Sequence, residues 1–275
     1  MVNNQAILNQ MVLSESIAGD TAIGHSLAYA GLAEKLAGLE LPGSLHLQRA
    51  VALELERIAV HIGDTAAICN DIAYQLGQVV CEALRTIVIN TTQLWCGNRF
   101  GKGMIRPAGT RYPLTSGLVN QMLENLTDVE ARYFALTDRL FSLPSALGRL
   151  EGIGRITTMQ ASLAGLVGMA ARSSGMYRDI RWSHPFGGYR ERDFSPEMLP
   201  GGDVYARAML RRREVESSLN LIRETLKGIN VGSTIPVPDF NLRFQPSSLA
   251  ISLTEGWRGE ICHVALTDES GAIIH

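Results

Sequence analysis

Cysteine, aromatic residues and charge are all sparse in this sequence of 275 residues. Its four cysteines are far apart and form no CxxC pair, which argues against a disulfide framework, a zinc knuckle and an iron-sulfur ligand set. Free cysteines in mostly apolar surroundings suit a reducing, cytoplasmic compartment. Because the net charge is only −2 and no basic surface is apparent, we expect no nucleic-acid partner.

Long apolar runs and targeting signals are missing as well. No window reaches about 18 uninterrupted apolar residues, so we expect no membrane-spanning segment, and any membrane association should come through partners. The N-terminal segment MVNNQAILNQ lacks the basic region and the apolar core of a signal peptide. With 46% hydrophobic residues the chain can still bury a sizeable core, as one large domain or two small ones.

The sequence does contain a long proline-free stretch over residues 45–76. As a helix it would be roughly 48 Å long, and its apolar residues point in nearly every direction, as in a helix buried inside a large domain. Its polar residues are separated by 3, 4, 3 and 7 positions and so form one narrow seam: Glu54, Arg57, His61, Asp64 and Asp71. Either Glu54 pairs with Arg57 and His61 with Asp64 as an ion-pair ladder, or the seam faces a polar cavity or a partner subunit.

Further helices are expected on both sides of this stretch. The apolar periodicity predicts them over 22–39, 77–95, 118–140 and 161–172, with Thr115 and Ser116 as candidate caps of the third. A last long helix should begin at Asp203, its N-cap. Arg211 lies at core spacing on this helix. A buried arginine needs a carboxylate, and Glu54, Asp64 and Asp71 of the seam are the candidates.

The remaining segments are predicted to be loops and a small β element. Residues 97–113 are basic and glycine-rich, but they lack the GxxxxGK[ST] order and a preceding strand, which argues against a nucleotide loop. Residues 173–194 are too polar for a core and too aromatic for a linker, so they form either a functional loop or an ordered surface loop. Prolines mark an irregular stretch after Gly228, followed by predicted strands at 249–254 and 261–267 and a turn at 268–271.

Six segments, taken together, carry a family likeness. They are HSLAYAGLAEKLAG, ERIAVH followed by Asp71, GNRF with IRPAG, ARSSGMYRDIRWSHPFGGY, GDVYARAMLRRREVESSLNLI and TEGWRGEICHVALTD. In order and spacing they resemble the 49 kDa subunit of NADH:quinone oxidoreductase, which is itself similar to the large subunit of [NiFe] hydrogenases, including the membrane-bound, formate-hydrogenlyase type. The likeness covers roughly residues 16–270.

The resemblance implies a mainly α (α+β) fold, a long-helix bundle with a small peripheral β element near the C-terminus. Residues 1–275 would form a single hydrogenase-large-subunit-like domain, with a helical core over about 16–228 and a β-containing part over about 229–275. A protein of this family binds an iron-sulfur small subunit, and the buried cavity between the two receives either quinone or protons.

The resemblance also implies an internal polar network around that cavity. Its candidate residues are His25, Arg57, His61, Asp71, Arg99, Arg106, Arg172, Asp179, Arg211, Glu255, Arg258, Glu260 and His263. Further matched positions are Glu34, Arg181, Tyr189, Asp203 and Arg207. Because proton coupling requires a group that titrates near neutrality, His61 is the natural candidate for that role.

Departures from the family pattern limit what can be carried over. Ala18 and Thr21 occupy the positions of the first metal-binding CxxC pair of hydrogenases, and the chain reaches His275 without the second pair. Since a [NiFe] centre requires thiolate ligands, we expect no such centre and no metal in this chain. The tyrosine expected at the quinone headgroup falls on Gly19, and the N-terminal histidine-bearing hairpin is missing. We therefore expect either a family member shortened at both termini or a fragment of a longer chain.

Two functions follow from the resemblance. The first is a subunit of a membrane-associated NADH:quinone oxidoreductase-like complex, which oxidises NAD(P)H with quinone as acceptor and in which this chain is inactive alone. The chain would hold no cofactor other than quinone, and iron-sulfur clusters would lie in the partner. The partners would be an iron-sulfur small subunit, a 30 kDa-type subunit and, indirectly, membrane subunits, on the cytoplasmic face of the membrane. The alternative is a structural scaffold of a hydrogenase-like complex that has lost its active site.

Overall fold

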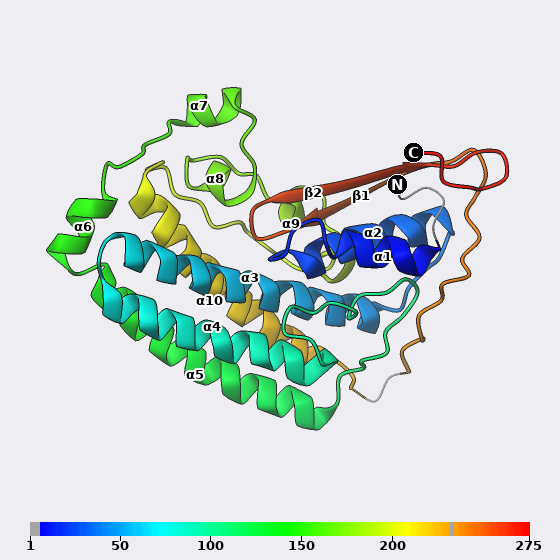
Figure 1. The fold of residues 1–275 in the computed structure, drawn as a ribbon, viewed down its shortest axis with the longest axis horizontal. Helices are drawn as coiled ribbons and strands as arrows, with labels where there is room; N and C mark the ends of the chain where they lie inside the picture. The colour runs from blue at the N-terminus through cyan, green and yellow to red at the C-terminus, as the bar shows by residue number, and fades with distance from the viewer. Residues whose placement is uncertain (1–5, 232–233) are drawn as a thin grey trace.

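The computed structural model describes residues 6–231 and 234–275 (Figure 1). Residues 1–5 of the N-terminal segment and 232–233 of the predicted irregular stretch lie outside the described residues. The fold is mainly α-helical with one small two-stranded antiparallel sheet, as the sequence predicts. The long helices are α3 (Gly43–Asp71), α4 (Gln75–Cys96), α5 (Ser116–Leu140) and α10 (Val204–Gly228). The shorter elements are α1 (Ile7–Ser14), α2 (Ala22–Leu36), α6 (Pro144–Leu150), α7 (Thr158–Leu163), α8 (Gly168–Arg172), α9 (Ile180–Ser183), the 3₁₀ turn η1 (Gly187–Tyr189), β1 (Leu249–Glu255) and β2 (Glu260–Leu266).

Helix α3 is the centre of the bundle. It packs along α4 on one side and α10 on another, and α5 packs against both of these helices (Figure 1). Its apolar residues Val51, Leu55, Ile58 and Ile62 are completely buried, as expected for a helix that is apolar all round. At 29 residues it is about 44 Å long.

The predicted end of the central helix is wrong by five residues. Helix α3 stops at Asp71 because Ala73 takes a left-handed conformation with φ of 61°, which turns the chain into α4. Gly77, the predicted break, lies inside α4. A side chain there would meet the Tyr74 ring at 2.5 Å and the Cys69 sulfur at 2.7 Å, so close packing accounts for this glycine.

The helix caps follow the sequence, but one predicted helix is interrupted. The Thr115 side chain accepts a hydrogen bond from Leu118 N, and that of Asp203 accepts one from Ala206 N, so both predicted N-caps are confirmed. The single helix predicted over 161–172 is instead split into α7 and α8, because Gly165 and Gly168 both adopt positive φ values.

The β hairpin lies against α2 (Figure 1). Its register pairs Leu249 with Leu266 and Glu255 with Glu260, and both strands begin and end within one residue of their predicted limits. Ala250 and Ala265 face α2, where they pack with Leu32 and Leu36. The last part of the chain therefore rests on one of its first helices.

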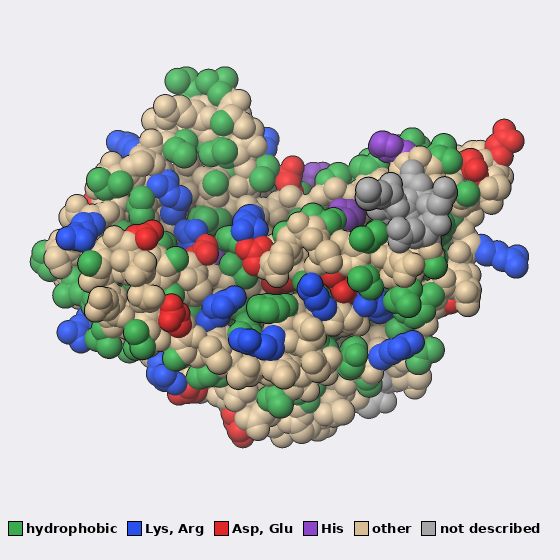
Figure 2. Space-filling view, in the orientation of Figure 1, with side chains coloured by type: hydrophobic (Ala, Val, Ile, Leu, Met, Phe, Trp, Pro, Cys, Tyr) green, Lys and Arg blue, Asp and Glu red, His purple; other side chains and the backbone are tan. Residues whose placement is uncertain are grey.

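The surface mixes charge and apolar side chains. On the face shown in Figure 2, acidic and basic side chains are interspersed with apolar ones. Within the part of the chain that the structure describes, no helix is both long and apolar enough to cross a lipid bilayer.

Candidate functional site

The first three residues of the polar seam of α3 are buried and form the start of a network of charged side chains. Glu54, Arg57 and His61 are at most 1% exposed. The predicted pair of Glu54 with Arg57 is present, with 3.2 Å between Oε2 and Nε. The predicted pair of His61 with Asp64 is wrong. His61 Nε2 instead lies 2.7 Å from Glu214 Oε2 on α10, while Asp64, nearer the surface, binds Arg211 at 2.9 Å.

Two arginines from the region of α8 and α9 extend this network. Arg172, at the end of α8, donates to Glu214 and, at 2.8 Å, to Glu255 of β1, and it lies 3.3 Å from Asp179. Arg181 of α9 pairs with Asp179 at 2.7 Å and with Glu54 at 3.0 Å. Five elements, α3, α8, α9, α10 and β1, thus place their charges in one buried volume.

Hydroxyl and carbonyl groups complete the network. Tyr189 of η1 donates to Glu54 Oε1 at 2.6 Å, and Ser218 of α10 donates to Glu54 Oε2. Arg57 donates to the backbone carbonyls of Glu255, at 2.7 Å, and Gly256, at 3.1 Å. The hairpin turn is therefore bound directly to the central helix.

The pKa values of the network follow from burial opposed by ion pairs. Burial disfavours the charged form of Glu54, but Arg181 and Arg57 outweigh it and hold the pKa of this carboxyl at about 2. The pKa of Glu214 is likewise held well below its usual range, against burial, by Arg172 and His61. Burial lowers the pKa of His61 even though Glu214 favours its charged form, so we take His61 as neutral at pH 7.

The network holds more carboxylates than guanidinium groups. Its carboxylates are Glu54, Asp179, Glu214 and Glu255, and its guanidinium groups are Arg57, Arg172 and Arg181. Burial and the neighbouring Asp179 charge raise the pKa of Glu255, as expected where one negative charge is uncompensated. Among these four carboxylates, Glu255 is the one whose surroundings favour the protonated form.

Two buried polar atoms beside the network have no hydrogen-bond partner among the described residues. They are Nδ1 of His61 and Nε1 of Trp257. The two rings meet edge to face with centroids 6.2 Å apart. If the neutral imidazole donates through Nε2 to Glu214, its Nδ1 carries a free lone pair that can accept a proton.

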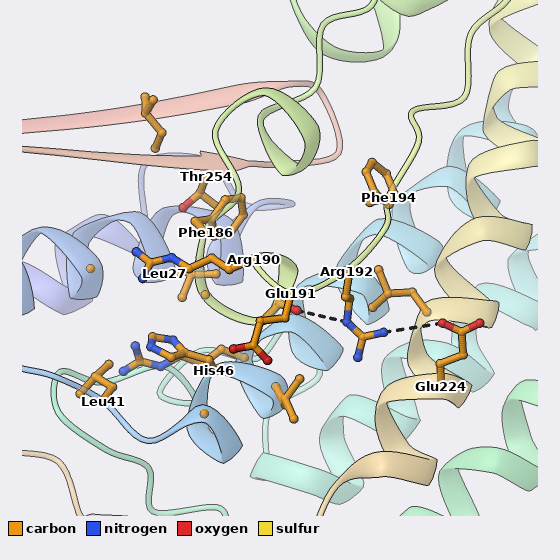
Figure 3. Close-up of a pocket in the computed structure, with 18 of the residues that line it drawn as sticks. Leu27, Leu41, His46, Phe186, Arg190, Glu191, Arg192, Phe194, Glu224 and Thr254 are labelled. Atoms are coloured by element: carbon orange, nitrogen blue, oxygen red, sulfur yellow. Dashed lines mark hydrogen bonds and ion pairs between the residues drawn. The ribbon is translucent and has the colours of Figure 1, made fainter.

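A cleft of about 1400 Å³ lies on the other side of η1 (Figure 3). It is bounded by α2, the first part of α3, the segment 186–197, α10 and β1. Its lining is mixed: Phe186 and Phe194 are aromatic, while Arg192 pairs with Glu224 across one end (Figure 3). Tyr189, which bonds Glu54, directly follows the cleft-lining residues Gly187 and Gly188, so the network lies behind this wall.

Some of the site residues predicted from the sequence lie in this network, and the others lie elsewhere in the structure. Five of them meet in it: Arg57, His61, Arg172, Asp179 and Glu255. Tyr189 and Arg181 belong to it as well.

Other candidates are paired elsewhere: Arg211 with Asp64, Arg106 with Glu15, Arg258 with Asp20, Glu34 with Arg49, and His25 with His263. Asp203 caps α10, and Arg207 bonds the carbonyls of Gly154 and Gly202. Asp71, Arg99 and Glu260 are exposed.

Glu214 is the charged network residue that sequence reasoning missed, and Ser218 was not named either. Glu214 lies between Arg211, three residues before it, and Ser218, four residues after it, on a helix whose apolar face was recognised. A glutamate next to the core residue Val215 was the available signal, because charged side chains are rarely buried unless they are paired.

The donor atoms near the start of α2 do not fit a thiolate-bound metal. Ala18 and Thr21 offer no thiolate where the hydrogenase pattern has its first cysteine pair. Three of the cysteines, Cys69, Cys81 and Cys96, are buried, and burial raises the pKa of each thiol. Among the described residues no group of three or more histidine, cysteine, aspartate or glutamate side chains could hold a metal ion.

A family model described as "Respiratory-chain NADH dehydrogenase, 49 Kd subunit" matches residues 71–269. This chain belongs to that family. The family resemblance predicted from the six segments is thereby confirmed.

Curated relatives come from both branches of the resemblance. The chain is 29% identical to the carbon monoxide-induced hydrogenase of Rhodospirillum rubrum, over 98% of this chain and 74% of that protein. It is 28% identical to formate hydrogenlyase subunit 5 of Escherichia coli, of which it spans 45%. It is 29% identical to an NADH-quinone oxidoreductase subunit of Thermosipho melanesiensis, over 89% of this chain and 67% of that one.

A solved structure shows the same fold. It belongs to the membrane-bound sulfane sulfur reductase, described as an archaeal respiratory membrane complex. The match has a TM-score of 0.90 and covers 99% of this chain and 75% of that chain, at 21% identity. This chain therefore shares its fold with that structure.

The ionisation of Glu54 predicts a dependence of stability on acid pH. Because the pKa of Glu54 is lowered, its ion pairs contribute stability above the unfolded value near 4.5, and this contribution is lost as the pH falls towards 2. We expect Glu54→Gln to lower the free energy of unfolding by about 3 kcal/mol at pH 7. The difference from wild type should shrink towards pH 2. Urea unfolding followed by circular dichroism at pH 7, 4 and 2.5 measures it, and a difference independent of pH would contradict the assignment.

Proposed function

We propose that this chain is a peripheral subunit of a membrane-associated, NADH:quinone oxidoreductase-like redox complex. In that complex it forms one wall of a quinone or proton cavity against an iron-sulfur partner subunit, without a [NiFe] centre of its own. The observation that carries this proposal is the buried network with one carboxylate more than it has arginines. A group of buried charges that can gain and lose one proton is suited to couple proton uptake and release to electron transfer in a neighbouring protein.

His61 is the proton-accepting member in this proposal. Its Nε2 is bound to Glu214, whereas its Nδ1 is buried and without a partner among the described residues. A proton gained at Nδ1 gives an imidazolium beside the Glu214 carboxylate and offsets the negative charge that the arginines leave uncompensated. The ion pairs of Arg57 and Arg172 keep the network in place through this change.

Membership of the family supports the partners and the location that we propose. Relatives named as subunits of a hydrogenlyase and of a quinone oxidoreductase, together with the fold of a respiratory membrane complex, support assembly with other subunits. We propose an iron-sulfur small subunit and a 30 kDa-type subunit as neighbours, with electrons from NAD(P)H reaching quinone through the partner's clusters. The chain would lie on the cytoplasmic face and contact the membrane through those subunits.

The test is quinone reductase activity of the complex purified through a tagged copy of this chain. We expect His61→Ala to lower the turnover number at least tenfold with the subunit composition unchanged, because the proton acceptor is removed. The control is His184→Ala, which changes an exposed histidine outside the network. Equal activity of the His61→Ala complex and wild type would remove the proton-coupling role of the network.

A structural scaffold is the second candidate. It is favoured by the fact that Glu54, Glu214 and the arginines are satisfied by one another, so the network also fixes a single packing of α3 on α10. In that case the purified complex would bind no short-chain quinone and His61→Ala would leave its activity unchanged. The subunit would then be needed only for assembly.

A further inference from the structure

Two histidines from opposite ends of the chain face one another outside the buried network. His25, near the start of α2, and His263, in β2, are 238 residues apart in the sequence. Nδ1 of His25 lies 3.2 Å from Nε2 of His263, and the ring centroids are 5.5 Å apart. Both side chains are half-buried, so a small solute has access to them. Figure 2 shows histidine side chains at the surface in the region of the hairpin.

The backbone around this pair is firmly held. Glu56 of α3 accepts hydrogen bonds from Ile23 N at 2.7 Å and Gly24 N at 3.0 Å, which fixes the first turn of α2 immediately before His25. His263 is paired with Ser252 in the hairpin register, and the hairpin packs on α2. The two rings are thus presented by rigid elements, as a preformed ligand site requires.

The rings are suited to act as neutral donors. Burial lowers the pKa of His25, and burial together with His25 lowers the pKa of His263 to about 4. At pH 7 both imidazoles are therefore uncharged, and each has a nitrogen lone pair. The carboxylate of Asp20, held by Arg258 at 2.7 Å, lies close enough to favour positive charge at His25.

The distance between the two nitrogens matches a shared ion. A transition metal bound by histidine lies about 2.0–2.1 Å from each nitrogen. Two nitrogens 3.2 Å apart would then subtend roughly 100° at the metal, between the square-planar and tetrahedral values. For both lone pairs to point at that ion, the rings must turn away from the present nitrogen-to-nitrogen direction by roughly 40° at each nitrogen.

We propose that His25 and His263 form a two-histidine binding site for a divalent transition metal ion of the zinc, nickel and copper group. Water molecules fill the remaining ligand positions on the open side. The site differs in donor atoms from the thiolate centre of hydrogenases, and it does not depend on the function proposed above. A plain hydrogen bond between the two rings is the competing explanation of their distance.

Zinc titration of the purified, chelator-treated full chain by isothermal calorimetry tests the proposal. We expect one ion per chain, and we expect His25→Gln and His263→Gln each to weaken binding at least tenfold. The controls are His184→Gln, an exposed histidine elsewhere, and Cys262→Ser, the neighbouring thiol on the alternate face of β2; both should retain wild-type affinity.

Copper(II) supplies a readout that requires no variant. We expect the electron paramagnetic resonance spectrum of the wild-type chain with one equivalent of copper to show coupling to two imidazole nitrogens. Circular dichroism establishes that the glutamine variants are folded. Failure to bind zinc, or binding that persists in the His25→Gln/His263→Gln double variant, would overturn the proposal and leave the hydrogen-bonded pair as the explanation.

Discussion

Glu214→Ala is expected to lower the free energy of unfolding by about 3–5 kcal/mol. Glu214 is the only carboxylate that bonds both Arg172 and His61 among the described residues, and its side chain is 2% exposed. Its removal leaves the completely buried Arg172 guanidinium with less compensating charge and also opens a small cavity. The loss should exceed that of an ordinary surface substitution, which is within about 0.5 kcal/mol.

The measurement is urea unfolding of the chain at pH 7, followed by circular dichroism. The matched control is Glu216→Ala, which removes the same carboxylate from an exposed position two residues along the same helix. We expect the control to lie close to wild type. Equal unfolding midpoints for the two variants would mean that Glu214 contributes no more than a surface charge.

Gly168→Ala is expected to destabilise the fold by about 2–5 kcal/mol. A methyl group at this position would lie 2.0 Å from the carbonyl oxygen of Arg258 and 2.2 Å from Cα of Gly259. Both are backbone atoms, so no side chain can turn away, and the hairpin turn must shift away from α8. Gly168 also has φ of +57°, which disfavours any residue with a Cβ.

Gly165→Ala separates these two causes. Gly165 has a similar φ of +64° but nothing within 4 Å of the added methyl group. It should therefore show only the conformational cost, about 1–2 kcal/mol. Thermal and urea unfolding of the two variants side by side measure the difference. A Gly168→Ala protein as stable as the Gly165→Ala protein would show that the turn moves without cost.

The sequence predicts this fold best where one periodicity runs over many residues. The apolar pattern of α3, α5 and α10 located these helices, and their cap residues Thr115 and Asp203 were found because capping depends on local hydrogen bonds. The split between α7 and α8 was missed, because a glycine can continue a helix or leave it, and only its surroundings decide.

The candidate site was predicted in part, for a related reason. Spacing on one helix identified the seam of Glu54, Arg57 and His61, but it suggested Asp64 as the partner of His61. The actual partner, Glu214, follows His61 by 153 residues and lies on α10. The packing of α10 on α3 cannot be derived from either helix alone. Family resemblance named Arg172 and Asp179, while it also named exposed residues such as Arg99 and Glu260.

The hydrogen bonds from Arg57 to the hairpin turn determine how this chain unfolds. Its guanidinium and the Glu255 carbonyl are 198 residues apart, and Arg172 joins the same strand to α10. If the hairpin detached alone, it would leave buried positive charge in the interior without its partners. The hairpin, α3 and α10 should therefore exchange their amide hydrogens as one cooperative unit, which opens only when the whole fold unfolds.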